Sequence, residues 1–445
     1  MRWAIWAALA SMMIGAAGQT AAPAAAKPAP PTVWEKYGTK TVNAELPRWL
    51  KLGGEARMRF EDDLGMGYRN GNDDAFLLQR LRLRMEVRPS QWMAFQFEGQ
   101  DSRVWGYKAQ PVPASILNAM DLRQAYLDLG KEGTVLSARV GRQGLVFGEG
   151  RLVADPAWSN TGRTFDAVRM TFTKGRFKAD AFAASVVKQK NADFDRRTDG
   201  DNFHGVYAVV REWTPGSTFE PYAFWRLNRG LKSEFGRTGK LDTKTAGFRW
   251  YGRLPARWEY NMEMAGQAGA WSADTMGAWA GHWGLGRTLN NSKWKPKATA
   301  EYRYASGDQD PKDGRHGAFD QLYPSAHDKF GLADQLMWSN LKHYRAAYEM
   351  TLTKTVTFKS GYNSFFLAEK RDALYAPGGK AVARSVNGTA GSHIGEEIDA
   401  QFFWTPNKNQ AFNIGYGRIF PGRFLKSTIS GVPYNAFFVN VAHVF

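Results

Sequence analysis

The 445-residue sequence contains no cysteine. The chain therefore forms no disulfide and carries no lipid on a cysteine, so its stability must come from hydrogen bonds and packing. No stretch approaches about 18 uninterrupted apolar residues, which excludes membrane-spanning helices. Acidic residues are in the minority, because 42 Asp and Glu stand against 59 Lys and Arg, a formal net charge of +17. This surplus favours anionic partners.

The N-terminus has the pattern of a secretory signal. Met1-Arg2 is positive, an apolar run from Trp3 to Ile14 follows, and small residues then predict cleavage near Gly18, with Ala26 as the latest option. We therefore predict a signal peptide over residues 1–18 and an exported protein. Residues 19–47 are rich in Ala and Pro and predict a periplasmic lead-in without an assigned fold, which could also enter the domain that follows.

One segment shows clear two-residue periodicity. In Arg80–Arg88 the charged residues alternate with Leu81, Leu83, Met85 and Val87, so a strand places all charges on one face. A helix would spread both classes around its circumference. Two orientations are open at this point. In a soluble sandwich the apolar face meets a core, whereas in a membrane barrel it meets lipid and the arginines line a lumen.

The spacing of such segments favours the barrel. From Trp49 onward about eighteen strand-like segments have lengths of about 8 to 12 residues, near what a tilted strand needs to cross a bilayer. Links after even-numbered segments are short and rich in turn formers, whereas most links after odd-numbered segments are long. Short turns at one rim and long loops at the other are typical of an outer-membrane barrel. We therefore predict an all-β, transmembrane, up-and-down antiparallel barrel over residues 48–445.

Aromatic content and the C-terminus agree with this fold class. The chain has 17 Trp, 17 Tyr and 28 Phe, yet its mean hydropathy is −0.47. Aromatic girdles around a polar interior account for both values. The last segment, Tyr434–Phe445, ends on an aromatic residue, which is typical of outer-membrane barrels.

With the apolar positions facing lipid, the opposite positions predict a charged lumen. Guanidinium groups can hold sugar carboxylates bidentately, and interspersed carboxylates prevent over-tight binding. The alternative is an electrostatic ladder that only stiffens the barrel. The parity of the segment around Arg123 is ambiguous. The candidate selectivity residues are Arg80, Arg82, Arg84, Arg123, Arg139, Arg249, Arg303, Arg345, Lys359, Glu349, Glu397 and Asp399.

Metal and catalytic motifs are weak. Asp308, Asp310 and Asp313 precede a glycine and resemble a calcium loop in composition, so they are candidate calcium ligands. Their irregular spacing and the intervening Lys312 favour an ordinary Asx turn. His316 and His327 are too loosely spaced for a zinc site. No nucleophile-elbow pattern surrounds Ser325, and no nucleotide loop occurs, so we expect no enzyme.

Several longer runs resemble the alginate export family of outer-membrane barrels. They are Gly141–Gln143, Phe319–Gly331, Trp338–Leu341, Ala368–Tyr375, Gly395–Asp399 and Gly415–Gly422. The resemblance implies an eighteen-stranded barrel with an arginine-rich constriction that passes anionic polyuronate from the periplasm to the exterior. At matching positions it implies Arg123, Arg142 and Arg345 as constriction residues, with Asp399 as an acidic neighbour.

We therefore expect an anion-selective outer-membrane channel that exports alginate or a similar acidic polysaccharide. One alternative is a porin for uptake of small anions or oligosaccharides, and another is an outer-membrane hydrolase. Expected partners are the anionic polysaccharide, outer-membrane lipid and, as a candidate, periplasmic export machinery, but not nucleic acid. Since an eighteen-stranded barrel can close alone, we expect a monomer.

Overall fold

The computed structural model describes residues 40–131, 133–191, 193–290 and 292–445. The predicted signal peptide and most of the predicted lead-in lie outside the described residues. Within them, no helix is long and apolar enough to cross a membrane. The described helices are α3 (Lys40–Glu45) and α4 (Arg423–Thr428), and short 3₁₀ turns cover Met66–Tyr68 and Pro255–Arg257.

Eighteen strands form the barrel, and all eighteen predicted segments correspond to one of them. They are β1 (Leu50–Leu64), β2 (Asp74–Ser90), β3 (Met93–Trp105), β4 (Asn118–Leu129), β5 (Leu136–Gln143), β6 (Phe165–Lys174), β7 (Phe177–Lys188), β8 (Arg196–Arg211), β9 (Ser217–Lys232), β10 (Thr238–Leu254), β11 (Trp258–Trp271), β12 (Asp274–Thr288), β13 (Lys297–Ala305), β15 (Leu341–Thr353), β16 (Val356–Leu367), β19 (His393–Asn407), β20 (Gln410–Pro421) and β21 (Tyr434–Val444).

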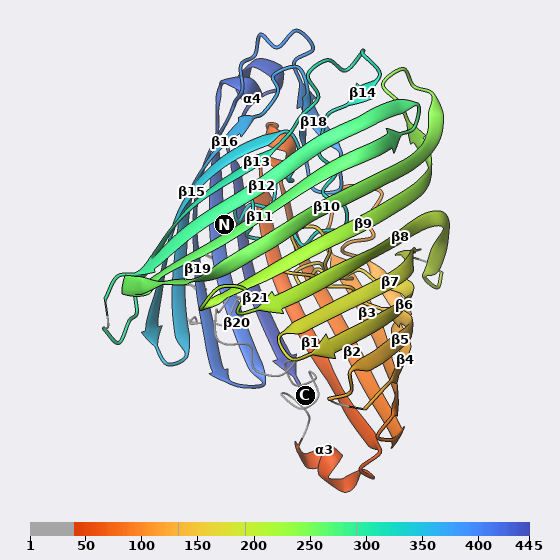
Figure 1. The fold of residues 1–445 in the computed structure, drawn as a ribbon. Coiled ribbons are helices and arrows are strands. Elements are labelled where there is room, and N and C mark those ends of the chain that lie inside the picture. The colour runs from red at the N-terminus through yellow and green to blue at the C-terminus, as the bar shows by residue number, and fades with distance from the viewer. Residues whose placement is uncertain (1–39, 132, 192, 291) are drawn as a thin grey trace.

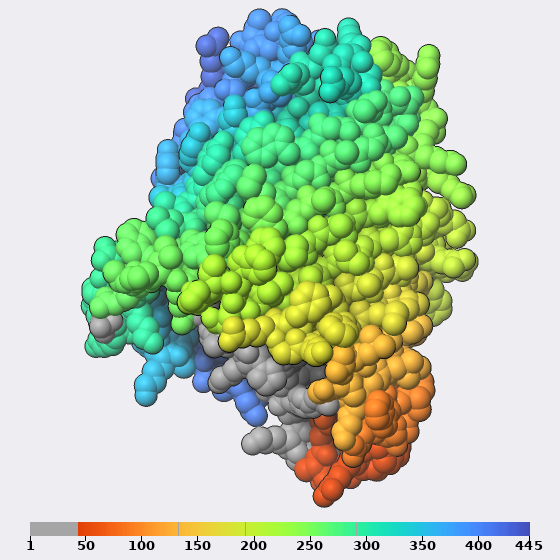
Figure 2. All heavy atoms as spheres, viewed as in Figure 1, coloured from red at the N-terminus to blue at the C-terminus, as the bar shows by residue number. Residues whose placement is uncertain are grey.

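Each strand pairs antiparallel with its neighbour in the chain, and β21 pairs with β1 to close the barrel. Figure 1 shows the strands tilted and the long connections with α4 gathered at the upper rim, whereas the C-terminus and α3 lie at the lower rim. In Figure 2 the side chains of the middle strands form a continuous outer wall. Closure pairs both edges of each of these eighteen strands.

Strand β2 has the orientation expected in a membrane barrel. Leu83 is 55% exposed on the outer surface, whereas Arg80 and Arg82 are 3% and 5% exposed inside the barrel. The apolar residues of this strand therefore face the membrane, and its arginines face the interior.

Two long loops enter the barrel. The first inner loop (residues 144–164) joins β5 to β6, and the second inner loop (residues 306–340) joins β13 to β15 and contains β14 (Arg315–His316). Backbone hydrogen bonds join the loops inside the lumen, from Ala154 N to Tyr323 O and from Tyr323 N to Leu152 O, each 2.8 Å. A small hairpin of β17 (Ala373–Tyr375) and β18 (Ala381–Arg384) lies in the next long connection.

The prediction of a polar interior is wrong for the part of the wall that faces these loops. Phe147 of the first inner loop stacks on inward-facing Phe182 and Tyr207, with ring centroids 5.2 and 5.0 Å apart. Phe203 and Phe224 complete this buried cluster. The loops explain the difference, because they bring apolar side chains that must be buried against an apolar wall.

Candidate functional site

The densest group of charges inside the barrel is an arginine wall on neighbouring strands. It comprises Arg57 and Arg59 of β1, Arg80, Arg82 and Arg84 of β2, and Arg123 of β4. The strand register places Arg57 directly opposite Arg80, and both side chains face inward. Like charges at opposing positions of a sheet repel each other, so this arrangement needs compensating acceptors.

Fewer carboxylates than arginines lie at the wall. Arg80 pairs with Glu55 and Arg59 with Glu61, each at 2.5 Å. Glu98 of β3 contacts three more arginines of the wall, Arg82, Arg84 and Arg123. Asp155 of the first inner loop lies 2.7 Å from Arg123. Six guanidinium groups thus share four carboxylates among the described residues, which leaves the wall with surplus positive charge.

Backbone carbonyl groups of the first inner loop supply the missing acceptors. Arg57 donates to the carbonyl oxygens of Ala157, Trp158 and Ser159 at 2.8 to 3.3 Å and to Asn160 Oδ1 at 3.1 Å. Arg80 also donates to Ala157 O and Ser159 O. The loop therefore covers this part of the wall with partial negative charge.

Arg123 reaches the lumen through a β-bulge. Gln124 pairs with Glu98 and Leu122 with Gly99, so Arg123 is the extra residue between them. A bulge shifts the side-chain alternation by one position, which places both Arg123 and Gln124 on the inner face. This bulge explains why the parity of the segment was ambiguous in the sequence.

The opposite side of the interior holds a second charge network, which joins both inner loops to the wall. Arg249 lies 3.1 Å from Glu149 of the first inner loop and 3.0 Å from Glu220. Arg345 contacts Asp328 of the second inner loop at 2.9 Å. Burial raises the pKa of Asp328, but nearby Arg345 outweighs this effect, so the pKa lies below its ordinary value.

The other predicted residues lie in smaller groups inside the barrel. Arg303 contacts Glu301 at 2.5 Å, Arg139 contacts Asp128 at 2.6 Å, and Lys359 contacts Glu349 at 3.4 Å. The remaining two are acceptors. Glu397 accepts hydrogen bonds from Leu332 N and Ala333 N, and Asp399 accepts one from Asn363. The structure therefore brings Arg80, Arg82, Arg84 and Arg123 together. It also links Arg303 to Arg345 through Glu301, and to Asp399 through His343 and Asn363.

Arg142 lies away from the arginine wall. It is three residues after Arg139, and the pairing register of β5 has no shift between them, so the two side chains are on opposite faces of β5. Arg142 is on the face of outward-pointing Val140 and pairs with Asp166 at 2.8 Å. It also donates to Asp195 O in the connection between β7 and β8. Its position at the strand end corrects the expectation that it lines the interior.

A cavity of about 610 Å³ lies at the long-loop end of the interior. Trp158 and Arg163 of the first inner loop and Leu322 of the second contribute to its lining, together with Arg59 and Arg226 of the wall. Trp158 is enclosed between Arg59 and His327, each 3.8 Å from its ring. The cavity therefore combines charged groups with aromatic surface.

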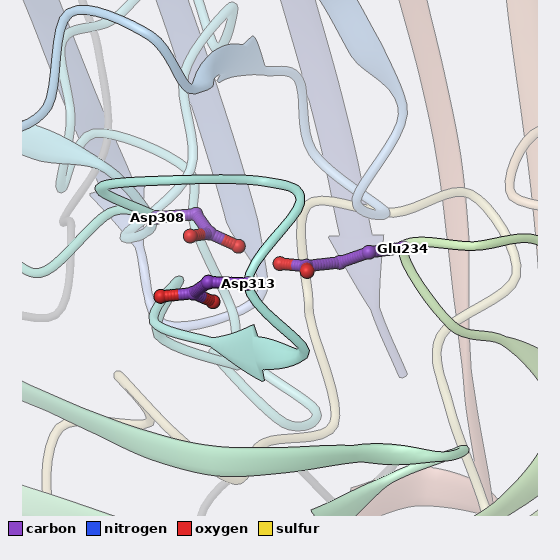
Figure 3. Close-up of side chains that lie close together, drawn as sticks. All are labelled: Glu234, Asp308 and Asp313. Atoms are coloured by element: carbon purple, nitrogen blue, oxygen red, sulfur yellow. The ribbon is translucent and has the colours of Figure 1, made fainter.

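The predicted calcium ligands are only partly brought together. Figure 3 shows Asp308, Asp313 and Glu234 pointing toward one another, and their nearest ligand atoms lie within 4.8 Å of one another. Glu234 comes from the connection between β9 and β10, and Asp310 is not part of this group. Burial, a hydrogen bond with Glu234 and its charge raise the pKa of Asp308 to about 8. Calcium binding here stays a prediction.

Several interior charges were not identified from the sequence. Arg57 and Arg59 alternate with Ala56, Met58 and Phe60, so the same two-residue periodicity could have found them. Asp155 and Arg163 lie in an irregular loop, where no periodicity shows which side chains face the lumen.

Solved structures with the same fold are outer-membrane barrels. Pseudomonas aeruginosa OpdQ is 12% identical with a TM-score of 0.63, covering 90% of this chain and 99% of its own. Acinetobacter baumannii OccAB2 is 12% identical with a TM-score of 0.59, covering 88% and 98%. The outer membrane protein opdK from Pseudomonas aeruginosa is 9% identical with a TM-score of 0.60, covering 89% and 98%. Comparison with curated protein sequences gives no significant match.

The fold, together with the charged side chains that line its interior, thus defines an outer-membrane β-barrel of the porin-like channel class. The family model described as "Alginate export" matches residues 48–437, nearly the whole described chain. The protein belongs to the alginate export family.

Proposed function

We propose that this protein is an anion-selective channel that exports alginate or a similar acidic polysaccharide through its arginine-lined interior. The arginine wall carries the proposal, because six guanidinium groups share four carboxylates. A carboxylated polymer would supply the anionic groups that the wall lacks. Family membership supports the polysaccharide class of the substrate.

Many weak sites suit transport better than one strong site. The carboxylates and carbonyl groups near the wall already engage part of each guanidinium group. A passing uronate unit therefore gains only the difference between its own contacts and those it replaces. Such partial compensation allows each unit to bind and also to leave.

Reconstitution into planar lipid bilayers tests this proposal. Under a KCl gradient, the reversal potential should show anion preference, and added polyuronate should block the current. Replacing Arg82 and Arg84 together by Ala should reduce the anion preference, whereas replacing outward-facing Arg103 should leave it unchanged. Cation selectivity, or no conductance at all, would contradict the proposal.

Uptake of small anions or oligosaccharides is a second candidate function. The two inner loops favour it, because they surround a cavity of about 610 Å³, within the range of small-molecule sites of about 300–1,000 Å³. In the same bilayer experiment, an uptake porin should respond to small anions and not to the polymer. Family and fold are those of a transport channel, so we assign no catalytic step to the chain.

A further inference from the structure

We infer that the cavity between the inner loops is a binding subsite for one sugar carboxylate and that Arg163 is the residue that recognises it. This inference rests on the proposed function, since it takes an acidic polysaccharide as the substrate. It adds a specificity-determining residue that lies in a loop and not in the arginine wall.

Arg163 uses little of its hydrogen-bonding capacity. A guanidinium group has five N–H donors. Among the described residues, Arg163 has a single side-chain hydrogen bond, from Nη1 to Pro324 O at 3.0 Å, and no carboxylate within 4.0 Å. Arg57 of the arginine wall also has no carboxylate partner, but it donates to four oxygen atoms. Arg163 therefore retains free donors, and it lines the cavity.

The other charged residues that line the cavity and belong to the described chain have partners. Two ion pairs and one histidine–carboxylate contact account for six of them, and the seventh, Asp63, accepts a hydrogen bond from Tyr434 at 2.8 Å. The pairs are Arg59 with Glu61, Arg226 with Asp320, and His327 with Asp334. Arg163 is thus the cation of this cavity that remains available to a ligand.

The surroundings of Arg163 favour an anion. Burial lowers the pKa of its guanidinium below the ordinary value, Tyr323 and Asp155 offset part of this shift, and nearby Arg226 adds to it. A bound carboxylate would relieve this unfavourable environment. A carboxylate also matches the planar guanidinium group and can accept two parallel hydrogen bonds.

The rest of the lining suits a sugar ring. Ser159, Ser325 and Gln335 offer groups that can hydrogen-bond hydroxyls, and Leu322 and Pro324 offer apolar surface. The inner loops hold these groups in place, because Asn160 donates to three backbone carbonyls of the wall and its neighbouring loop at 2.9 to 3.2 Å. The site is therefore pre-formed, which lowers the entropic cost of binding.

The inference can be tested by current block in planar bilayers with a linear tri-uronate, using an uncharged trisaccharide of the same length as the reference. Wild-type current should be blocked by the tri-uronate at much lower concentration than by the uncharged sugar. In Arg163→Gln the half-blocking concentration of the tri-uronate should rise about tenfold or more, since a charged hydrogen bond is lost. Block by the uncharged sugar should not change.

Two further variants make the result specific. Arg196→Gln removes the same charge from a side chain that is 68% exposed at the long-loop rim. The tri-uronate should block the current of this variant at the same concentration as that of the wild type. Arg163→Lys keeps the charge but loses the planar fork, so its half-blocking concentration should lie between those of the wild type and Arg163→Gln. If Arg163→Gln fails to insert into the bilayer, the comparison of Arg163→Lys with the wild type tests the inference.

The outcomes separate this inference from the proposed function. If the tri-uronate blocked the wild-type current, and its half-blocking concentration were the same for Arg163→Gln and Arg163→Lys, the subsite would be overturned. The proposed export function would still stand. Equal block of the wild type by both trisaccharides would overturn carboxylate recognition at Arg163. Wild-type current that is cation-selective and insensitive to the tri-uronate would overturn the proposed function, and the subsite with it.

Discussion

At the scale of single residues, Glu98 has the largest structural role in the arginine wall. Its side chain is 5% exposed and contacts Arg82, Arg84 and Arg123. Glu98→Gln should lower the free energy of unfolding by about 3–5 kcal/mol, because it leaves buried guanidinium groups without their shared carboxylate. Equilibrium unfolding in detergent measures this change.

Asp101→Asn is the matched control for Glu98. Asp101 lies on the outer side of the same strand and pairs with Arg103, whose side chain is 48% exposed. An exposed pair contributes about 0–1 kcal/mol, so this control should change stability little. If both variants lowered the free energy of unfolding by the same amount, the three contacts of Glu98 would stabilise the barrel no more than an exposed ion pair does.

A second prediction at this scale concerns pH and Asp308. Its pKa is raised to about 8, above the ordinary value of 3.8, so the folded loop holds a proton that the unfolded chain releases. The stability of this loop contact should therefore fall as pH rises from about 4 to about 8. Hydrogen exchange of the amides of Asp310–Gly314, corrected for its intrinsic pH dependence, should show protection falling across this range. Asp308→Asn should abolish the fall, and an unchanged fall would refute the assignment.

At the scale of structural elements, Asn160 fastens the first inner loop to the barrel. Its amide donates to Gln79 O, Arg103 O and Ile116 O, and its side chain is fully buried. Asn160→Ala leaves buried carbonyl groups without a donor, at about 1–3 kcal/mol each. The loop should loosen, and single-channel current should become noisier and larger.

Asn191→Ala provides the comparison for Asn160→Ala. Asn191 donates one hydrogen bond to Val112 O in an exposed position. Its removal should leave single-channel current unchanged. If Asn160→Ala also left the current unchanged, the first inner loop would not determine conductance.

Strands and loops differ in how far the sequence predicts them. β2 and β3 were predictable because alternation of charged and apolar residues is a local property of a strand between lipid and lumen. The same rule identified Arg80, Arg82 and Arg84. It gave no information on Arg163 or Asp155, because irregular loops have no side-chain period. The position of these residues depends on contacts between segments more than 150 positions apart, such as Arg163 with Pro324.

Local exceptions to alternation also limited the prediction. The bulge at Arg123 made its orientation ambiguous, whereas Arg142 was assigned to the interior by resemblance although its parity places it on the other face. The apolar wall around Phe203 followed from the inner loops, so a strand-by-strand interpretation had no basis to expect it.

At the scale of the whole molecule, the net charge of +17 should contribute to ion selectivity. Its effect is screened over a Debye length of about 10 Å at 0.1 M salt and about 3 Å at 1 M. Anion preference measured by reversal potential should therefore decrease strongly between these concentrations. A preference that is independent of salt would assign selectivity to close contacts alone.

The passage of acidic polymer is the central claim, and release from proteoliposomes tests it most directly. Vesicles containing the purified protein are loaded with polyuronate of defined length, or with an uncharged polysaccharide of the same length, and release is followed over time. The account predicts that polyuronate leaves faster than the uncharged polymer and that protein-free vesicles retain both. Retention of polyuronate by vesicles that release small anions would contradict it.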